Sequence, residues 1–184
     1  MIAMIRLAAV PVLLVVVVLC SASPEKHRTR TTVVAKFGGE CEGDPFEFSP
    51  QLRKLVEDAR QRTSNPCAGP DCDRAFTYDL NSDGRKEWFV RLSCGATGNC
   101  TWGIFSDRPA RFRGKFTAWF FYIHRRAGLW NALSTYEREG GAQGVVATLA
   151  NRRGAYVLTS ERREYGHYGN LQPFLKRMGV PKCS

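Results

Sequence analysis

The sequence predicts an α+β fold: an antiparallel β-sheet meander with one N-terminal amphipathic helix and a short C-terminal helix, stapled by disulfides. Three observations predict it. Residues 50–62 have helical apolar periodicity, alternating segments separated by turn residues follow from residue 76, and six cysteines follow an N-terminal export signal. The chain of 184 residues is long enough for one domain with a sizeable core.

Residues 1–22 have the features of a cleaved export signal. Arg6 precedes an apolar run over 7–19, and Cys20-Ser21-Ala22 supplies small residues suited to signal-peptidase cleavage after residue 22. The run is shorter than the roughly 20 residues of a spanning helix, which disfavours an uncleaved membrane anchor. A lipid-modified Cys20 is a third alternative, disfavoured by the large leucine before it. We therefore expect a secreted or periplasmic protein.

The mature chain begins with a polar segment and continues as one domain. Residues 23–32 are basic and show no apolar periodicity, so we expect a flexible lead-in. Cleavage would leave 162 residues, which is 184 less 22, and this length suits one ordinary domain. We place a single exported α+β domain at 33–184.

The helix over 50–62 is predicted by both its cap and its periodicity. Ser49 can cap the first turn, and proline at position 50 suits the start of a helix. Apolar residues then recur with helical spacing; they are Leu52, Leu55, Val56 and Ala59.

The segments after residue 76 alternate as strands do. Residues 76–78 and 87–92 flank a tight turn and predict a hairpin, with Trp88, Val90 and Leu92 on one face of the second strand. Further strand-like segments are 101–105, 117–124, 130–137, 145–150 and 155–162. Residues 171–178 predict the short final helix, with Pro173 in its first turn.

The cysteines predict a disulfide framework. Removing Cys20 with the signal leaves six of the seven cysteines, which permit 15 pairings. Sequence spacing favours three pairs: Cys67 with Cys72, Cys94 with Cys100, and Cys41 with Cys183. Zinc is the rival interpretation, disfavoured because the compartment is oxidising and no C-x-x-C pair is present.

The turn of the first hairpin has the ligand spacing of a Ca²⁺ loop. Asp79, Asn81 and Asp83 occupy positions one, three and five, and Gly84 occupies position six. Val90 stands at position twelve and lacks a side-chain oxygen, which excludes a complete EF-hand and limits the affinity to about 10⁻⁴–10⁻³ M. The candidate ligands are Asp79, Asn81, Asp83, the Arg85 carbonyl and Glu87. Because Asp and Asn also bond to their own backbone in turns, a purely structural turn remains the alternative.

Residues 78–102 resemble a group of small exported bacterial proteins of unassigned function. The hallmark of that group is a D-x-N-x-D-G-x-x-E hairpin followed by a CG-x-x-G-NC loop, and both are present here, ending in Cys94-Gly-Ala-Thr-Gly-Asn-Cys100. The resemblance implies an exported antiparallel fold and no particular activity. The same turn is similar to those of FG-GAP-like extracellular Ca²⁺ modules, although no blade repeat is present.

The charge indicates an anionic partner. Without Arg6, 26 of the 27 basic residues remain against 17 acidic ones, a net charge of about +9. Basic residues near Phe112, Phe116 and the aromatic run 119–122 are candidates for anion binding; they are Arg108, Arg111, Arg113, Lys115, Arg125 and Arg126. An ordinary solvated hairpin has the same pattern. Export disfavours nucleic acid and favours an anionic envelope component or an acidic protein.

Catalytic motifs are scarce in the sequence. It contains no G-x-S-x-G elbow, H-E-x-x-H pair or Walker loop. The predicted function is therefore a non-catalytic binding or inhibitory domain. The alternative is a small secreted hydrolase that uses His167, which lies between glycines, with Glu164.

Overall fold

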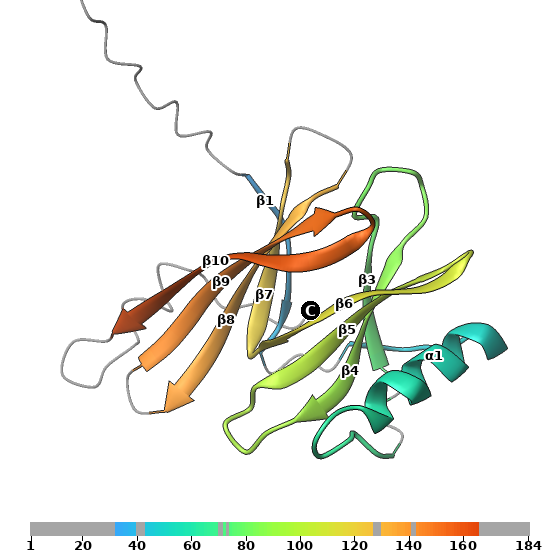
Figure 1. Ribbon diagram of the computed structural model, residues 1–184, viewed down its shortest axis with the longest axis horizontal. Helices are drawn as coiled ribbons and strands as arrows, with labels where there is room; N and C mark the ends of the chain where they lie inside the picture. Colours follow the sequence, from blue (N-terminus) through green and yellow to red (C-terminus); the bar gives the residue numbers. More distant parts are fainter. Residues whose placement is uncertain are drawn as a thin grey trace, which may run out of the picture. The chain divides into compact units, whose positions relative to one another are not determined.

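The computed structural model describes residues 32–39, 43–69, 72, 74–126, 130–140 and 143–165. Within these residues, ten strands form two five-stranded antiparallel sheets, and there is one helix (Figure 1). The fold is mostly β, so the predicted α+β fold with a single meander is wrong. The export signal, Cys41, Cys183, His167 and the predicted helix over 171–178 lie outside the described residues.

Each sheet contains a run of strands that are consecutive in the chain. The first sheet has the order β2 (Asp44–Pro45), β3 (Arg74–Tyr78), β4 (Glu87–Cys94), β5 (Cys100–Asp107) and β6 (Ala110–Ala118). The second has the order β1 (Val33–Gly38), β7 (Phe120–His124), β8 (Ala132–Gly140), β9 (Gln143–Arg152) and β10 (Ala155–Tyr165). Only β1, at one edge of the second sheet, departs from sequence order.

The chain changes sheets at Trp119, inside the segment predicted as one strand over 117–124. The Trp119 N–H donates to the carbonyl of Tyr136 at 2.7 Å, and its carbonyl accepts from the Gly39 N–H at 2.7 Å. These bonds join the backbone at Trp119 to the second sheet, directly after β6 ends in the first sheet. Both sheets bury apolar residues, so the apolar pattern continues across the change and conceals it.

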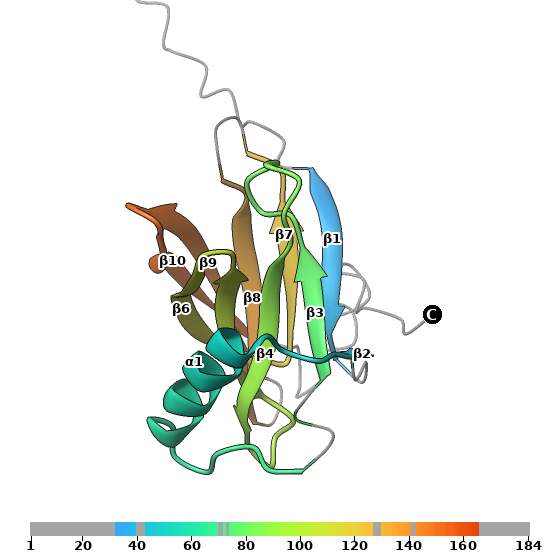
Figure 2. The same cartoon turned by 90° about the vertical axis from the view of Figure 1, so that its right-hand side faces the viewer.

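The main core lies between the two sheets. Phe89 of β4 contacts Phe121 of β7 with ring centroids 4.9 Å apart, and Trp102 of β5 lies 5.5 Å from the same ring. Ile104, Ile123 and other buried apolar residues complete this cluster. One face of each sheet thus contributes to a shared core, and Figure 2 shows this sandwich from the side.

Helix α1 (Pro50–Gln61) covers the outer face of the first sheet, as its predicted apolar stripe requires. Leu52 and Val56 pack against Val90 and Leu92 of β4 in a second core cluster. Since Phe89 faces the other sheet and Val90 faces the helix, β4 is buried on both sides. The N-cap is confirmed, because the Ser49 side chain accepts the Leu52 N–H at 3.2 Å.

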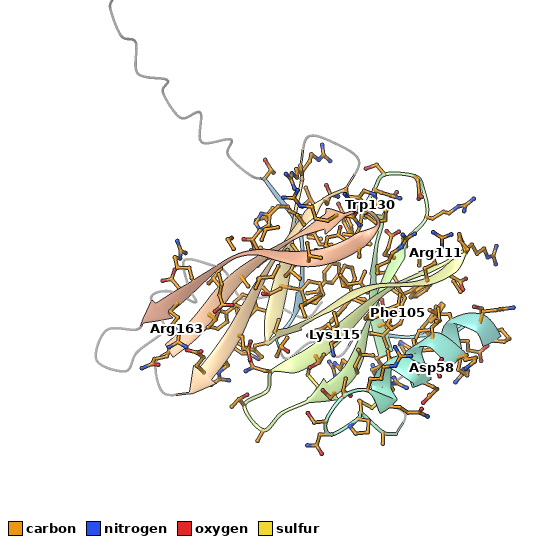
Figure 3. The ribbon with its side chains drawn as sticks, in the orientation of Figure 1. Asp58, Phe105, Arg111, Lys115, Trp130 and Arg163 are labelled. Carbon is orange, nitrogen blue, oxygen red and sulfur yellow. A yellow bond between two sulfur atoms is a disulfide. The ribbon has the colours of Figure 1, made fainter. Side chains whose placement is uncertain are left out.

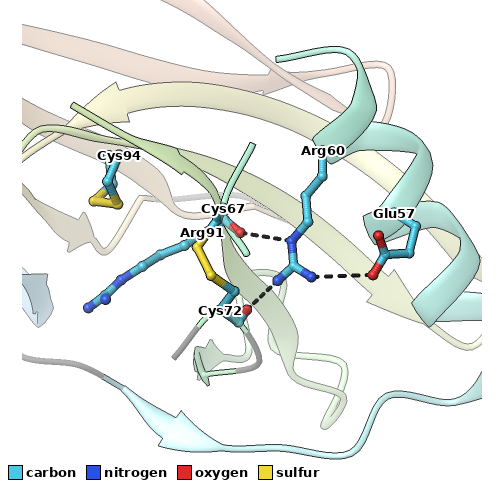
Figure 4. The surroundings of a disulfide bond; sticks show 7 residues. Glu57, Arg60, Cys67, Cys72, Arg91 and Cys94 are labelled. Carbon is cyan, nitrogen blue, oxygen red and sulfur yellow. Dashed lines mark hydrogen bonds and ion pairs between the residues drawn. A yellow bond between two sulfur atoms is a disulfide. The ribbon is translucent and has the colours of Figure 1, made fainter. Parts of the chain in front are cut away.

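The two short disulfides are confirmed, and Arg60 of α1 fixes the surroundings of one of them. The structure joins Cys67 to Cys72 and Cys94 to Cys100. The Arg60 guanidinium is buried; it donates to the Cys72 carbonyl and, at 3.4 Å, to the Arg91 carbonyl of β4 (Figure 4). One side chain therefore ties the helix, the disulfide loop and the sheet together.

The Cys94–Cys100 loop connects the first sheet to the second through Asn99. The Asn99 amide Nδ2 donates to the Arg138 carbonyl of β8 at 2.6 Å, and its Oδ1 accepts the Arg138 N–H at 2.9 Å. The Arg138 guanidinium lies over the Trp119 ring at 4.8 Å. This pairing gives a structural role to the asparagine of the CG-x-x-G-NC motif.

No helix in the described part of the chain is long and apolar enough to cross a membrane.

Candidate functional site

The turn between β3 and β4 is held by its own side chains. Asp79 accepts the N–H groups of Asp83, at 3.2 Å, and of Gly84, at 2.8 Å. Asn81 Oδ1 also accepts the Asp83 N–H, at 3.1 Å, and Gly84 has a φ of +82°, which glycine adopts without strain. These Asx-type hydrogen bonds fix the turn whether or not an ion is present.

The Asp83 carboxylate is also held by two hydrogen bonds within the turn. Its oxygens accept from the Asn81 amide at 2.9 Å and from the Arg85 N–H at 2.8 Å, and these bonds, the first above all, lower the pKa of Asp83. Asp79, Asn81 and Asp83 therefore come together, as the predicted metal set requires. Across the described residues, no three Asp, Glu, His or Cys side chains are close enough to hold a metal ion.

Glu87, the remaining side chain of that set, faces inward. Its side chain is buried, with the residue only 3% exposed, and Oε2 accepts the Leu80 N–H at 2.9 Å. Burial raises the pKa of Glu87, and the charges of Asp83 and Asp79 raise it further. The sequence pattern placed Glu87 among the candidate ligands, whereas the structure employs it to hold the start of the turn.

Replacing Glu87 by glutamine should stabilise the fold at neutral pH. Because the folded-state pKa is raised above the ordinary value of 4.5, the stability that this group contributes is present below pH 4.5 and is lost as the pH rises through the folded-state pKa. Glutamine keeps an acceptor for the Leu80 N–H and carries no charge. For each factor of ten by which the folded protein binds the Glu87 proton more tightly than the unfolded chain does, we expect the free energy of unfolding at pH 7 to rise by about 1.4 kcal/mol in the variant.

Urea unfolding of Glu87→Gln and the parent between pH 4 and pH 7 would measure this gain. The difference should shrink toward pH 4, where the parent carboxyl is protonated in both states. Glu47→Gln, at an exposed position, serves as the control and should show no such trend. A Glu87→Gln variant that is less stable than the parent at pH 7 would contradict the prediction.

A cleft lies between this turn and the hairpin of β5 and β6. The two hairpins are joined by the Arg85 guanidinium, which donates to the Arg108 carbonyl at 2.9 Å. The first lobe of the cleft has a volume of about 320 Å³. Its lining residues are Asn81, Asp83, Arg85, Lys86, Glu87, Trp88, Ser106, Asp107, Arg108 and Arg113.

A second lobe of about 520 Å³ adjoins the start of α1. Its lining residues are Ser49, Gln51, Arg85, Asp107, Arg108, Pro109 and Ala110. The helix is fixed to the hairpin here, because the Ser49 hydroxyl donates to Asp107 Oδ1 at 2.5 Å. Arg85, Asp107 and Arg108 line both lobes, so the two cavities adjoin one another at these residues.

The six predicted anion-binding residues do not form one patch. Arg108 and Arg113 line the cleft, whereas Arg111 and Lys115 lie exposed along β6, outside both lobes (Figure 3). Arg125 and Arg126 follow β7 in the second sheet. Strand β6 has a bulge opposite Ile104 and Phe105, so its basic residues cannot share one face by simple alternation.

Arg113 is held by the protein itself. Its Nε donates to the Ser106 hydroxyl at 3.0 Å, its Nη1 donates to the Gly154 carbonyl at 3.1 Å, and its guanidinium lies 5.4 Å from the Trp130 ring centre. Arg113 therefore contributes a fixed positive charge to the first lobe. It also joins β6 of the first sheet to the turn between β9 and β10 of the second.

Sequence reasoning missed the side chains of Arg85 and Lys86. Arg85 entered the prediction only through its carbonyl, as a metal ligand, and Lys86 did not enter at all. Both are exposed and line the cleft because the hairpin brings them opposite Arg108. The one available signal was that two basic residues directly follow a tight turn.

Only one residue of the candidate catalytic pair, Glu164, lies within the described part of the chain. Glu164 lies on β10 and forms an ion pair with Arg162 of the same strand, while His167 is outside the described residues. His124, at the end of β7, has both ring nitrogens buried without a hydrogen bond in the described chain, and burial lowers the pKa of its imidazole. Neither Glu164 nor His124 lines the cleft.

Comparisons with known proteins do not identify a family. No family model, no curated protein and no solved structure matches the chain. The resemblance to small exported proteins thus remains a prediction from two short motifs, and any function has to be argued from the cleft.

Proposed function

We propose that this chain is an exported, non-catalytic binding domain that holds an anionic ligand in the cleft between the two hairpins and the start of α1. The single observation that carries the proposal is that Arg85 and Arg108, from different hairpins, line both lobes. Planar guanidinium groups from two sides suit the recognition of a carboxylate or phosphate.

The charges of the cleft support this proposal. The first lobe is lined by four basic and three acidic side chains, an excess of positive charge. The chain as a whole has a formal net charge of +10, which attracts anions at long range. Cavities of roughly 300–1,000 Å³ are typical of ligand sites, and both lobes fall in that range.

Arg108 is free to engage a ligand. Its side chain is 88% exposed, and its ion pair with Asp107 is long, at 3.8 Å. Exposed ion pairs of this kind contribute about 0–1 kcal/mol, so an incoming anion can replace Asp107 at little cost. Arg85 is also exposed and keeps its backbone contact with the Arg108 carbonyl.

Removing both arginines should weaken anion binding. Hydrogen bonds to charged groups contribute about 1.5–3 kcal/mol, so the double variant Arg85→Ala/Arg108→Ala should bind citrate at least about tenfold more weakly than the parent. Titration calorimetry at low salt would measure the affinity, because salt screens exposed charges. Thermal melting would confirm that the variant is folded.

A charge-matched control makes this test specific. Arg111→Ala/Arg152→Ala also removes two exposed positive charges, both outside the two lobes. We expect its citrate affinity to stay within about twofold of the parent, the effect of lost long-range attraction alone. Equal losses in the two double variants would contradict a cleft-specific site and indicate binding by net charge.

We also propose weak Ca²⁺ binding by the β3–β4 turn, as a second candidate function. The observation that favours it is that Asp79 Oδ1 and Asn81 Oδ1 both accept the Asp83 N–H, at 3.2 and 3.1 Å, so the carboxylates of Asp79 and Asp83 are held in one turn where their negative charges repel each other. A bound divalent cation would relieve that repulsion. The ligands would be oxygens of Asp79, Asn81 and Asp83.

Millimolar Ca²⁺ should therefore raise the melting temperature. At ten times a millimolar dissociation constant, ligand binding stabilises the fold by about 1.4 kcal/mol, or roughly 3–6 °C for a domain of this size. Thermal shift in about 10 mM CaCl₂ against MgCl₂ at equal ionic strength would measure this. Asp83→Ala should abolish the rise, and a parent indifferent to Ca²⁺ would leave the turn purely structural.

A further inference from the structure

We infer that the ligand of the cleft is an acidic oligosaccharide, a chain of sugar units that carries carboxylate groups. This inference rests on the proposed anion-binding function and names the chemical class of the ligand. It follows from the lining of the cleft, in which Arg85 and Arg108 line both lobes and each lobe also presents uncharged and acidic hydrogen-bonding residues.

The shared arginines provide one anion position between two lobes. Arg85 and Arg108 line both cavities, so a carboxylate held by them has ligand on either side of it. The volumes of about 320 and 520 Å³ fall in the range of sites that hold drug-sized ligands, so the two lobes together have room for more than one sugar unit. A single small anion would leave most of this space to water.

The flanking side chains suit hydroxyl groups. The first lobe offers Asn81, Asp83 and Ser106, the second offers Gln51, and Asp107 lines both lobes. Carboxylates accept hydrogen bonds and repel anions, whereas amides and hydroxyls both donate and accept. A ligand that places many hydroxyls around a few carboxylates matches this arrangement.

The same lining disfavours anionic polymers that lack free hydroxyl groups. Nucleic acids require a surface dominated by lysine and arginine. Here three carboxylates, of Asp83, Glu87 and Asp107, stand among four basic groups and would repel phosphates that bring no hydroxyl groups to pair with them. A polyglutamate chain meets the same repulsion and lacks hydroxyls to pair with the acidic side chains.

The test compares four probes at equal ionic strength: a galacturonic acid tetramer, a neutral glucose tetramer, a tetraglutamate peptide and a short oligothymidylate. We expect the uronate tetramer to bind at least about tenfold more tightly than each of the others. Arg108→Ala should reduce the affinity for the uronate tetramer and should leave the weak affinity for the neutral tetramer unchanged.

A chain-length comparison tests contact with the second lobe. Gln51 is exposed in the first turn of α1 and lines the second lobe. Gln51→Ala should lower the affinity for the uronate tetramer about threefold to tenfold and leave the affinity for monomeric galacturonate unchanged. Gln61→Ala, exposed at the other end of the same helix, is the matched control. Equal affinities of Gln51→Ala and the parent for the tetramer would contradict the extended binding mode.

The outcomes separate this inference from the proposed function. If tetraglutamate or oligothymidylate binds as tightly as the uronate tetramer, and the loss in Arg85→Ala/Arg108→Ala persists, the cleft binds anions and the saccharide inference is wrong. If the citrate affinity is the same in that variant and in its charge-matched control, the proposed function fails and the inference fails with it.

Discussion

Replacing Arg60 by methionine should destabilise the domain by about 3 kcal/mol. The Arg60 guanidinium is buried and donates to the carbonyls of Cys72 and Arg91. Methionine keeps much of the apolar stem and removes both donors, which leaves two acceptors in a protein interior without hydrogen bonds from Arg60. Each buried group left unsatisfied costs about 1–3 kcal/mol. The ion pair with Glu57, at 3.4 Å and partly exposed, contributes little beside this.

Urea unfolding monitored by tryptophan fluorescence would measure the loss. Arg53→Met is the matched control, because Arg53 lies on the same helix and is exposed, and its replacement should change the free energy of unfolding by less than about 0.5 kcal/mol. If Arg60→Met costs no more than Arg53→Met, Arg60 does not join the helix to the disulfide loop and β4.

Replacing Asn99 by alanine should cost about 2–4 kcal/mol. The Asn99 side chain makes two hydrogen bonds to the backbone of Arg138, at 2.6 and 2.9 Å, and is only 9% exposed. Alanine leaves the N–H and the carbonyl of Arg138 without these partners, and each loss costs about 1–2 kcal/mol in this partly buried position. Because Asn99 lies in the loop between β4 and β5 of the first sheet and Arg138 lies on β8 of the second, this pair stabilises the contact between the sheets.

Thr97→Ala provides the comparison for this second change. Thr97 lies in the same disulfide loop and is exposed, so its replacement should be nearly neutral. Asn99→Asp keeps an acceptor for the Arg138 N–H and loses the donor, and its stability should fall between those of the parent and Asn99→Ala. Unfolding in guanidinium chloride would rank the three variants, and a neutral Asn99→Ala would contradict the role assigned to the motif.

Local features of the fold were predictable where a few neighbouring residues determine them. Helix α1 was predicted within one residue of its end, since Ser49 and Pro50 mark its start and an apolar stripe marks its buried face. The hairpin of β3 and β4 and the two short disulfides follow in the same way from the turn residues between their ends.

The division into two sheets was not predictable, because it depends on contacts between distant residues. Trp119 leaves the first sheet to bond with Tyr136 and Gly39, and the apolar pattern around it is the same as in a continuous strand. Strand β1 was missed for a related reason: its residues, Val33–Gly38, do not alternate between apolar and polar side chains, and pairing with β7 makes it a strand.

The cleft was predictable only in part. Arg108 and Arg113 belonged to the expected basic segment, but Arg85 reaches the same place from a hairpin 23 residues earlier in the chain. Glu87 fits the ligand spacing of a Ca²⁺ loop, yet the Leu80 N–H holds its side chain inside the fold. Spacing along a chain gives the residue types near a turn, whereas the direction of each side chain depends on the packing around it.

Mapping of NMR chemical shifts during a titration with citrate tests most directly whether the cleft binds anions. Backbone amides of residues 81–87, 106–108 and 110 should shift together with one dissociation constant, along with the side-chain Nε–H groups of Arg85 and Arg108. Shifts that concentrate at Arg125 and Arg126, or that spread evenly over the exposed basic residues, would contradict a binding site between the two hairpins.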